Sequence, residues 1–233
     1  MSERVVLEPA FILHRRPYRD TSWIVDLFTL HHGRIAAVAR SARGPRSRYR
    51  GALELFVPMW VSWWGRRELK TLGHVECQGN STALQGEALL CGFYLNELLM
   101  RLLQREDPYP PLFTTYQEAL GQLMGNRGQT QAVLRCFEKK LLYELGYGLM
   151  LTQEVGIGTP IHAEHYYQYI PDNGFSRCEP RAVPHFFSGR SLIALQEEVF
   201  QDTQVLQEMK HLMRLVLTQH LGDRPLKSRE LLK

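Results

Sequence analysis

The sequence lacks the short motifs by which many enzymes are recognised. No G-x-x-x-x-G-K-[ST] phosphate loop occurs, because the glycine-rich stretch GIGTP at 156–160 has no lysine. There is also no G-x-S-x-G turn around a nucleophilic serine and no H-E-x-x-H zinc motif. No group of residues therefore supplies a nucleophile, a base and an oxyanion hole together. The sequence predicts a protein that is not an enzyme.

Cysteine is scarce, and no two cysteines form the C-x-x-C pair that zinc ribbons need for tetrahedral ligation. His162 and His165 are three residues apart, but no matching carboxylate or cysteine pair accompanies them, so we interpret them as solvated turn residues. We predict no bound metal, no cofactor, and free thiols in a reducing compartment at Cys77, Cys91, Cys136 and Cys178.

Long apolar runs are also missing. The opening residues, MSERVVLEPAFILHRR, carry early acids and an apolar run too short for a signal peptide. No stretch approaches the roughly 18 apolar residues that span a bilayer. The sequence therefore predicts a cytoplasmic protein that does not enter a membrane.

The charge is unevenly distributed along the chain. Residues 1–70 contain 13 Lys and Arg against 6 Asp and Glu, whereas residues 71–233 contain 15 against 18. All four tryptophans also lie in the first 70 residues. This asymmetry predicts two units, of which the first faces an anionic partner.

Residues 39–51, ARSARGPRSRYRG, contain five arginines and no acid. A loop that only confers solubility usually mixes acids with its cations, whereas the planar arginine fork binds phosphate oxygens in pairs. Tyr49 here and Tyr18 in HRRPYRD can stack on bases, although a basic patch can equally bind an acidic protein. The predicted DNA-binding residues are Arg15, Arg16, Arg19, Arg40, Arg43, Arg46, Arg48, Tyr49 and Arg50.

The first 80 residues read as five short strands, at 9–14, 22–30, 34–40, 52–64 and 68–76, separated by turn signals. Pro58 lacks an N–H donor and indicates an edge or bulge in the fourth strand. Five strands without a helix predict a small closed barrel of the OB-fold type, on which a basic, aromatic surface suits a single strand of nucleic acid. Of Trp60, Trp63 and Trp64, at least one is expected in the core, and the sequence leaves open which stack on bases.

Residues 81–233 are predicted to be mainly helical. Apolar residues recur at helical spacing within 85–107, 111–124, 129–148, 188–200 and 204–222. Between the third and fourth helices, residues 150–186 lose this period, and Asp172, Asn173 and Gly174 predict a hairpin turn. We therefore expect an α+β protein, with a barrel domain at 1–80 and a helical domain at 81–233 that carries a small β-hairpin.

At this point the sequence resembles the RecO family of bacterial recombination mediators. The segments that carry the resemblance are FILHRRPYRDTSWIVDLFT, HGRIAAVARSARGPRSRYRGAL, ELKTL, YLNELLMRLL, LRCFEKKLLYELGYG and LGDRPLKSREL. The resemblance implies an OB-fold and a helical domain. It also implies binding of single- and double-stranded DNA, strand annealing, and loading of a recombinase, together with RecR, onto DNA coated with single-strand-binding protein. A mobile arginine loop would reduce the repulsion between the two strands.

Two further expectations follow from this resemblance. Some family members carry a four-cysteine zinc module after the LGYG motif, but residues 149–169 contain no cysteine, so no zinc site is expected. The family also implies an encounter with the short acidic tail of single-strand-binding protein. We place that site on helix 129–148, beside apolar Phe137 and Leu141, at Arg135, Lys139 and Lys140.

Two alternatives stay open. The apolar face of helix 129–148 is equally explained as ordinary core packing with solvated cations opposite. The whole protein is alternatively a protein-interaction adaptor whose barrel is mainly a scaffold. Salt dependence separates the two functions, because phosphate-driven binding weakens steeply with salt whereas apolar docking does not.

Overall fold

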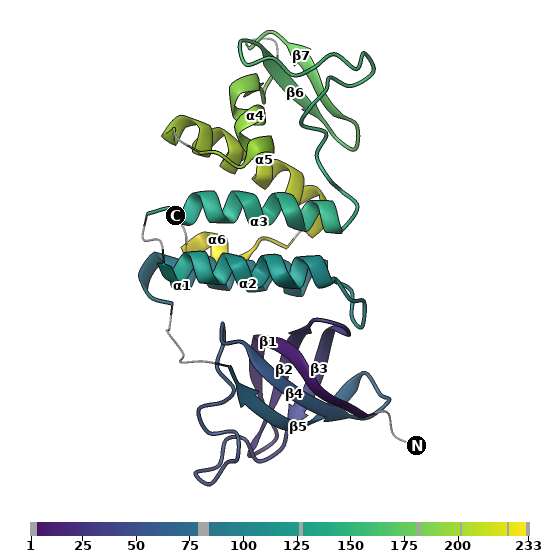
Figure 1. Cartoon of the computed structure of the whole chain (residues 1–233), viewed down its shortest axis with the longest axis vertical. Helices are drawn as coiled ribbons and strands as arrows, with labels where there is room; N and C mark the ends of the chain where they lie inside the picture. Colours follow the sequence, from purple (N-terminus) through teal and green to yellow (C-terminus); the bar gives the residue numbers. More distant parts are fainter. Residues whose placement is uncertain are drawn as a thin grey trace. The chain divides into compact units, whose positions relative to one another are not determined.

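The computed structural model describes residues 4–78, 84–125, 128–180, 183–200, 202–222 and 224–231. The chain packs into two compact units (Figure 1). The first comprises residues 1–125 together with 226–233, and the second comprises residues 126–225. Among the described residues, no helix is both long and apolar enough to cross a membrane.

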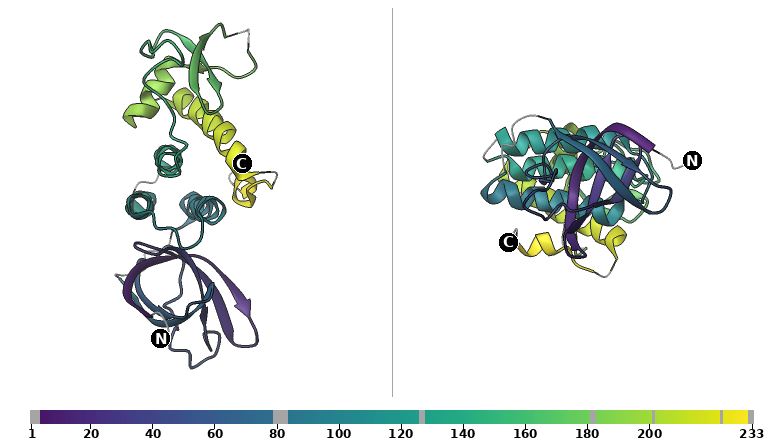
Figure 2. Two further views of the ribbon diagram at one scale, coloured as in Figure 1. Left: turned by 90° about the vertical axis from the view of Figure 1, so that its right-hand side faces the viewer. Right: turned by 90° about the horizontal axis from the view of Figure 1, so that it is seen from below.

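The first unit contains the predicted five-stranded OB-type barrel, which is confirmed. Its strands are β1 (Arg4–Tyr18), β2 (Ser22–Thr29), β3 (Gly33–Ala39), β4 (Met59–Trp64) and β5 (Leu69–Cys77). They close in the order β1-β2-β3-β5-β4, with β3 and β5 parallel and the other neighbours antiparallel. The left view of Figure 2 shows these strands curving around the barrel.

The barrel interior is filled by alternate residues of each strand, as the period of two requires. Val25 and Leu27 of β2 meet Val61 and Trp63 of β4 in one apolar cluster. Residues 52–58, predicted as the first half of the fourth strand, are not in a strand. Leu53 of this segment instead packs into the barrel interior.

Three helices complete the first unit: α1 (Gly86–Leu102), α2 (Pro110–Gly125) and α6 (Lys227–Leu231). Phe11 and Phe28 on the outside of the barrel pack against Phe113 and Tyr116 of α2, with ring centroids 5.1–6.1 Å apart. This packing joins the barrel to α2, so α2 belongs to the same unit as the barrel although the sequence places a domain boundary at residue 80. Residues 79–83 themselves lie outside the described residues.

The second unit contains α3 (Thr130–Glu144), β6 (Tyr166–Ile170), β7 (Gly174–Cys178), β8 (Phe187–Ser188), α4 (Gly189–Glu197) and α5 (Thr203–Leu221). The predicted hairpin is present, since Ile170 pairs with Gly174 across the turn and Asp172 has a φ of 59°. Ser188 caps the N-terminus of α4, because its hydroxyl accepts a hydrogen bond from the Ser191 N–H.

Candidate nucleic-acid interface

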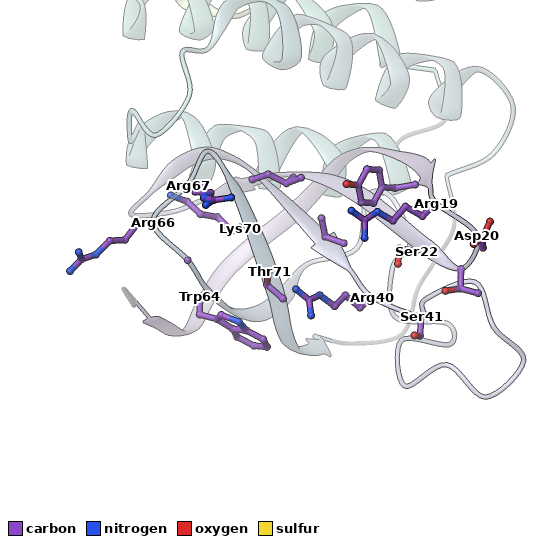
Figure 3. A pocket seen from close by; sticks show the side chains of 15 residues that line it. Arg19, Asp20, Ser22, Arg40, Ser41, Trp64, Arg66, Arg67, Lys70 and Thr71 are labelled. Atoms are coloured by element: carbon purple, nitrogen blue, oxygen red, sulfur yellow. The ribbon is translucent and has the colours of Figure 1, made fainter. Parts of the chain in front are cut away.

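A groove of about 860 Å³ opens on the barrel (Figure 3). Three chain segments form it: the β1–β2 turn at 18–22, the end of β3 with the start of the next loop at 38–41, and the β4–β5 turn at 64–71. The strand order explains this meeting, because β3 and β5 are neighbours. The charged residues of its wall are five cations and one carboxylate: Arg19, Arg40, Arg66, Arg67, Lys70 and Asp20.

The cations of the groove differ in how much of their charge is available. Lys70 is buried, and its Nζ lies 2.7 Å from Glu106 Oε1, which neutralises it. In the described part of the chain, Arg40, Arg66 and Arg67 have no ion-pair partner within 4.0 Å, and Figure 3 shows Arg66 extending outward from its turn. These three exposed guanidiniums therefore give the groove most of its positive potential.

Two residues of the groove wall hold a strained backbone. Arg19 has a φ of 51° and Ser41 a φ of 55°, in the left-handed region that favours glycine. Each such residue costs on the order of 1 kcal/mol, and such strain concentrates at functional sites. The loop start is tied to the β1–β2 turn, because the Arg43 N–H donates to Thr21 O at 2.8 Å.

The structure corrects the expectation that Tyr49 is an exposed stacking group on a mobile arm. Tyr49 is 4% exposed and belongs to the barrel core. Its hydroxyl donates to Leu72 O at 2.8 Å and accepts from Arg48 Nη2 at 2.6 Å. The arginine loop is therefore fastened over the barrel by a buried tyrosine, and its cations project from a fixed support.

The other predicted arginines fall into two groups. Arg15 and Arg43 each lie 5.6 Å from the Trp23 ring centroid, and Arg15 also pairs with Glu54. These two, like Arg48, take part in packing within the unit. The second group of arginines is exposed, and within the described residues their side chains form no hydrogen bond, ion pair or ring contact. These are Arg16, Arg46 and Arg50.

The groove gathers Arg19 and Arg40 from the predicted set and adds residues that the sequence prediction missed. These are Arg66, Arg67 and Lys70. Of the three tryptophans whose role the sequence leaves open, Trp64 lines the groove. A usable signal existed at β4, where alternation through MWVSWW points Met59, Val61 and Trp63 inward and Trp64 outward. Arg66 and Arg67 follow Gly65 in the short turn between the fourth and fifth predicted strands, where two cations alone do not indicate a binding site.

The partner-binding prediction on α3 also needs correction. Arg135 is 3% exposed, and its Nη2 lies 2.7 Å from Glu138 Oε1 one turn along the same helix, so it is not a surface cation. Lys139 Nζ donates to the carbonyls of Leu195 and Gln196 at the end of α4. Lys140 is the most exposed of the three, at 41%, and lies 3.8 Å from Glu198.

The predicted histidine pair is present as a ring contact, since the centroids of His162 and His165 are 5.8 Å apart. Within the described ranges, no group of three or more His, Cys, Asp or Glu side chains is placed to hold a metal ion. The absence of zinc stays a prediction, which elemental analysis of purified protein would test.

Comparison with known proteins shows which family this chain belongs to. Residues 1–80 match the family model described as Recombination protein O N terminal, and residues 83–230 match Recombination protein O C terminal. The chain belongs to the RecO family. The resemblance found in the sequence is confirmed.

Curated relatives named DNA repair protein RecO are similar along the whole chain. The Coxiella burnetii protein is 58% identical, and 100% of both chains is covered. The Methylococcus capsulatus protein is 46% identical over 99% of this chain and 94% of its own. The Alkalilimnicola ehrlichii protein is 47% identical over 98% of this chain and 91% of its own. RecO membership places the chain among the proteins of DNA repair.

Proposed function

We propose that the barrel groove binds the phosphate backbone of single- and double-stranded DNA, and that the protein anneals complementary strands as a recombination mediator. The observation that carries this is the wall of the groove, where the exposed guanidiniums of Arg40, Arg66 and Arg67 face the single carboxylate of Asp20, while Lys70 is neutralised by Glu106. Guanidinium forks hold phosphate oxygens in pairs, without regard to base sequence. Such binding suits a repair protein that must act at any DNA sequence.

Annealing needs two polyanions held close together. The groove supplies one cationic surface, and the arginine loop supplies a second, which begins at Arg40 in the groove wall. Because Tyr49 fastens the loop, its exposed cations Arg46 and Arg50 are held in place before DNA arrives, which lowers the entropic cost of binding. Annealing makes no covalent bond, so the proposal requires no catalytic group.

The family membership supports a proposal for the partners as well. We infer that the protein works in the bacterial cytoplasm with RecR, and that it loads a recombinase onto DNA coated with single-strand-binding protein. For the acidic tail of that protein, Lys140 is the available cation on α3, because Arg135 is buried and Lys139 is bonded to α4. An acidic tail would compete with Glu198 for Lys140.

The test of DNA binding is the salt dependence of oligonucleotide affinity. The variant Arg66→Ala/Arg67→Ala removes two groove cations, and Arg177→Ala/Arg214→Ala removes two exposed arginines of the second unit as a matched control. Fluorescence anisotropy with a labelled single strand should show weaker binding only for the groove variant. Its log–log salt slope should be about 1.4 smaller, at about 0.7 per phosphate contact.

The same measurement addresses the adaptor alternative. If the barrel is mainly a scaffold, the affinity and slope of the groove variant will equal those of the control variant. That result would overturn the proposed function.

A further inference from the structure

Trp64 is an exposed tryptophan at the end of a barrel strand. Its neighbour Trp63 points into the barrel and is 3% exposed, whereas Trp64 is 40% exposed and lines the groove. An exposed large aromatic ring is unfavourable in water. What distinguishes Trp64 is its place, because this ring shares one groove with the exposed cations Arg40, Arg66 and Arg67.

Gly73 on β5 fixes how this ring lies. A Cβ atom added at Gly73 would be 2.7 Å from Cζ3 and 3.3 Å from Cε3 of Trp64. The six-membered ring therefore packs against the β5 backbone at Gly73, where only a residue without a Cβ atom leaves room for it. Gly73 does not have a positive φ, so space, and not backbone conformation, accounts for glycine here.

The strand beneath the ring is itself held. The Tyr49 hydroxyl lies 3.0 Å from Gly73 O, so the loop anchor also fixes the backbone on which Trp64 rests. A ring supported in this way has lost most of its freedom before any ligand binds. Stacking on it then costs little conformational entropy.

The groove around Trp64 selects the kind of ligand. Arg40 lines the same groove and can hold a phosphate, while the indole offers a flat apolar surface. A base in a duplex is covered on both faces by its neighbours, whereas an unpaired base has a free face. The combination therefore fits a single-stranded polynucleotide.

We propose that Trp64 is a stacking platform for one unpaired base of the strand whose phosphates lie in the groove, and that it gives the groove a preference for single over double strands. This rests on the proposed DNA binding. Gly73 is a positioning residue, because a Cβ atom there would meet the indole at 2.7 Å and the Ser62 carbonyl oxygen at 3.0 Å.

Affinities are measured for three probes: a single-stranded oligonucleotide, an abasic strand of equal length with the same phosphates, and a duplex. Trp64→Ala should weaken the affinity for the single strand by about 5- to 150-fold, the range expected for one base–aromatic stack. The abasic strand and the duplex should be affected by less than about twofold. Trp64→Phe should retain most of the affinity, and Trp64→Leu should not, because leucine covers β5 without offering a ring.

Gly73→Ala tests the support without changing charge or removing the ring. The added methyl should displace the indole and lower the affinity for the single strand, as Trp64→Ala does. The double variant Trp64→Ala/Gly73→Ala should bind the single strand no more weakly than Trp64→Ala alone. Oligonucleotide should also quench tryptophan fluorescence in the wild type more than in Trp64→Phe. Thermal unfolding of every variant would check that the barrel remains folded.

The outcomes separate this inference from the function on which it rests. Unchanged single-strand affinity in Trp64→Ala, with a loss in Arg66→Ala/Arg67→Ala, would overturn the stacking role and leave DNA binding standing. Equal losses for abasic and normal strands would likewise overturn stacking, because the indole would then act through packing. Undiminished binding in all variants would remove both proposals.

Discussion

The Tyr49 hydroxyl donates a hydrogen bond to the backbone carbonyl of Leu72, 2.8 Å away on β5. This bond joins the middle of the arginine loop to the barrel wall, and Arg48 adds to it by donating to the same hydroxyl. The loop is therefore built as a cap on the barrel interior. Its charge acts from a fixed position beside the groove.

Replacement of Tyr49 by phenylalanine should destabilise the first unit. The ring would still fill its place in the core, but the Leu72 carbonyl would lose its shorter hydrogen bond and keep only the 3.4 Å bond from Arg48. The expected loss is about 1–2 kcal/mol in the free energy of unfolding. Urea denaturation would measure it, with Tyr143→Phe as control, because Tyr143 is 73% exposed. A loss of equal size in the control would contradict the anchoring role.

The loop arginines should separate into two classes. Arg46→Ala/Arg50→Ala should leave the unfolding free energy unchanged and weaken DNA binding, since both side chains are exposed. Arg43→Ala/Arg48→Ala should weaken binding and also destabilise the unit, because Arg43 lies over Trp23 and Arg48 bonds to Tyr49. Denaturation and anisotropy on the same samples would show this. Equal stability of both variants would contradict it.

The barrel could be predicted from the sequence because strand alternation and turn residues are local signals. The burial of Tyr49 could not, because its partner Leu72 is 23 residues away and a glycine-proline loop gives no sign of folding back. The groove was only half predicted for a similar reason. Arg40 and Arg66 come from separate turns, and the parallel pairing of β3 with β5 brings them to one wall.

Helical periodicity had a comparable limit on α3. It correctly placed Phe137 and Leu141 on a buried face. The i,i+3 spacing of Arg135 and Glu138 indicates that they can form an ion pair, but it could not show that this pair is buried, because burial depends on what packs over the helix. Nor could it show that Lys139 reaches the last carbonyls of α4, which are 56 and 57 residues away in sequence.

Lys139 and Lys140 form a matched pair for testing that arrangement. Lys139→Met should lower the free energy of unfolding by about 1–2 kcal/mol, because two terminal carbonyls of α4 and Glu198 lose their cation. Lys140→Met should be nearly neutral for stability, since the lysine is only half-buried and its ion pair with Glu198 is long. Denaturation of both variants is the measurement. The reverse order of effects would contradict the capping role.

Cys136 should be an unreactive thiol. Burial, followed by the nearby Glu198 carboxylate, raises its pKa to about 11. At pH 8 only about one thiol in a thousand would then be ionised, so alkylation should be about a hundredfold slower than in unfolded protein. Mass spectrometry of the labelled Cys136 peptide would follow the rate. Glu198→Gln should accelerate the reaction, and an unchanged rate in that variant would exclude the carboxylate as a cause.

Glu97 should make the first unit sensitive to acid. Burial alone would raise its pKa, but hydrogen bonds from the Ser228 hydroxyl and from the N–H groups of Ser228 and Lys227 outweigh it, so the pKa lies below 4.5. A carboxyl with a depressed folded pKa stabilises the protein fully above its unfolded pKa, and this contribution is lost as the pH falls through the folded pKa. The docking of α6 on α1 should therefore weaken as the pH falls from the unfolded pKa of Glu97 through its folded pKa.

The variant Glu97→Gln isolates this contribution. At pH 7 it should lower the free energy of unfolding by about 1 kcal/mol, a modest value because Glu97 is only partly buried. The difference from the wild type should narrow as the pH falls from about 4.5 through the folded pKa, since the wild-type carboxyl is protonated first in the unfolded protein and then in the folded protein. Urea denaturation at pH 7 and pH 4 measures it, with exposed Glu118→Gln as the control. A difference that stays constant with pH would mean that packing, and not charge, holds α6 at this site.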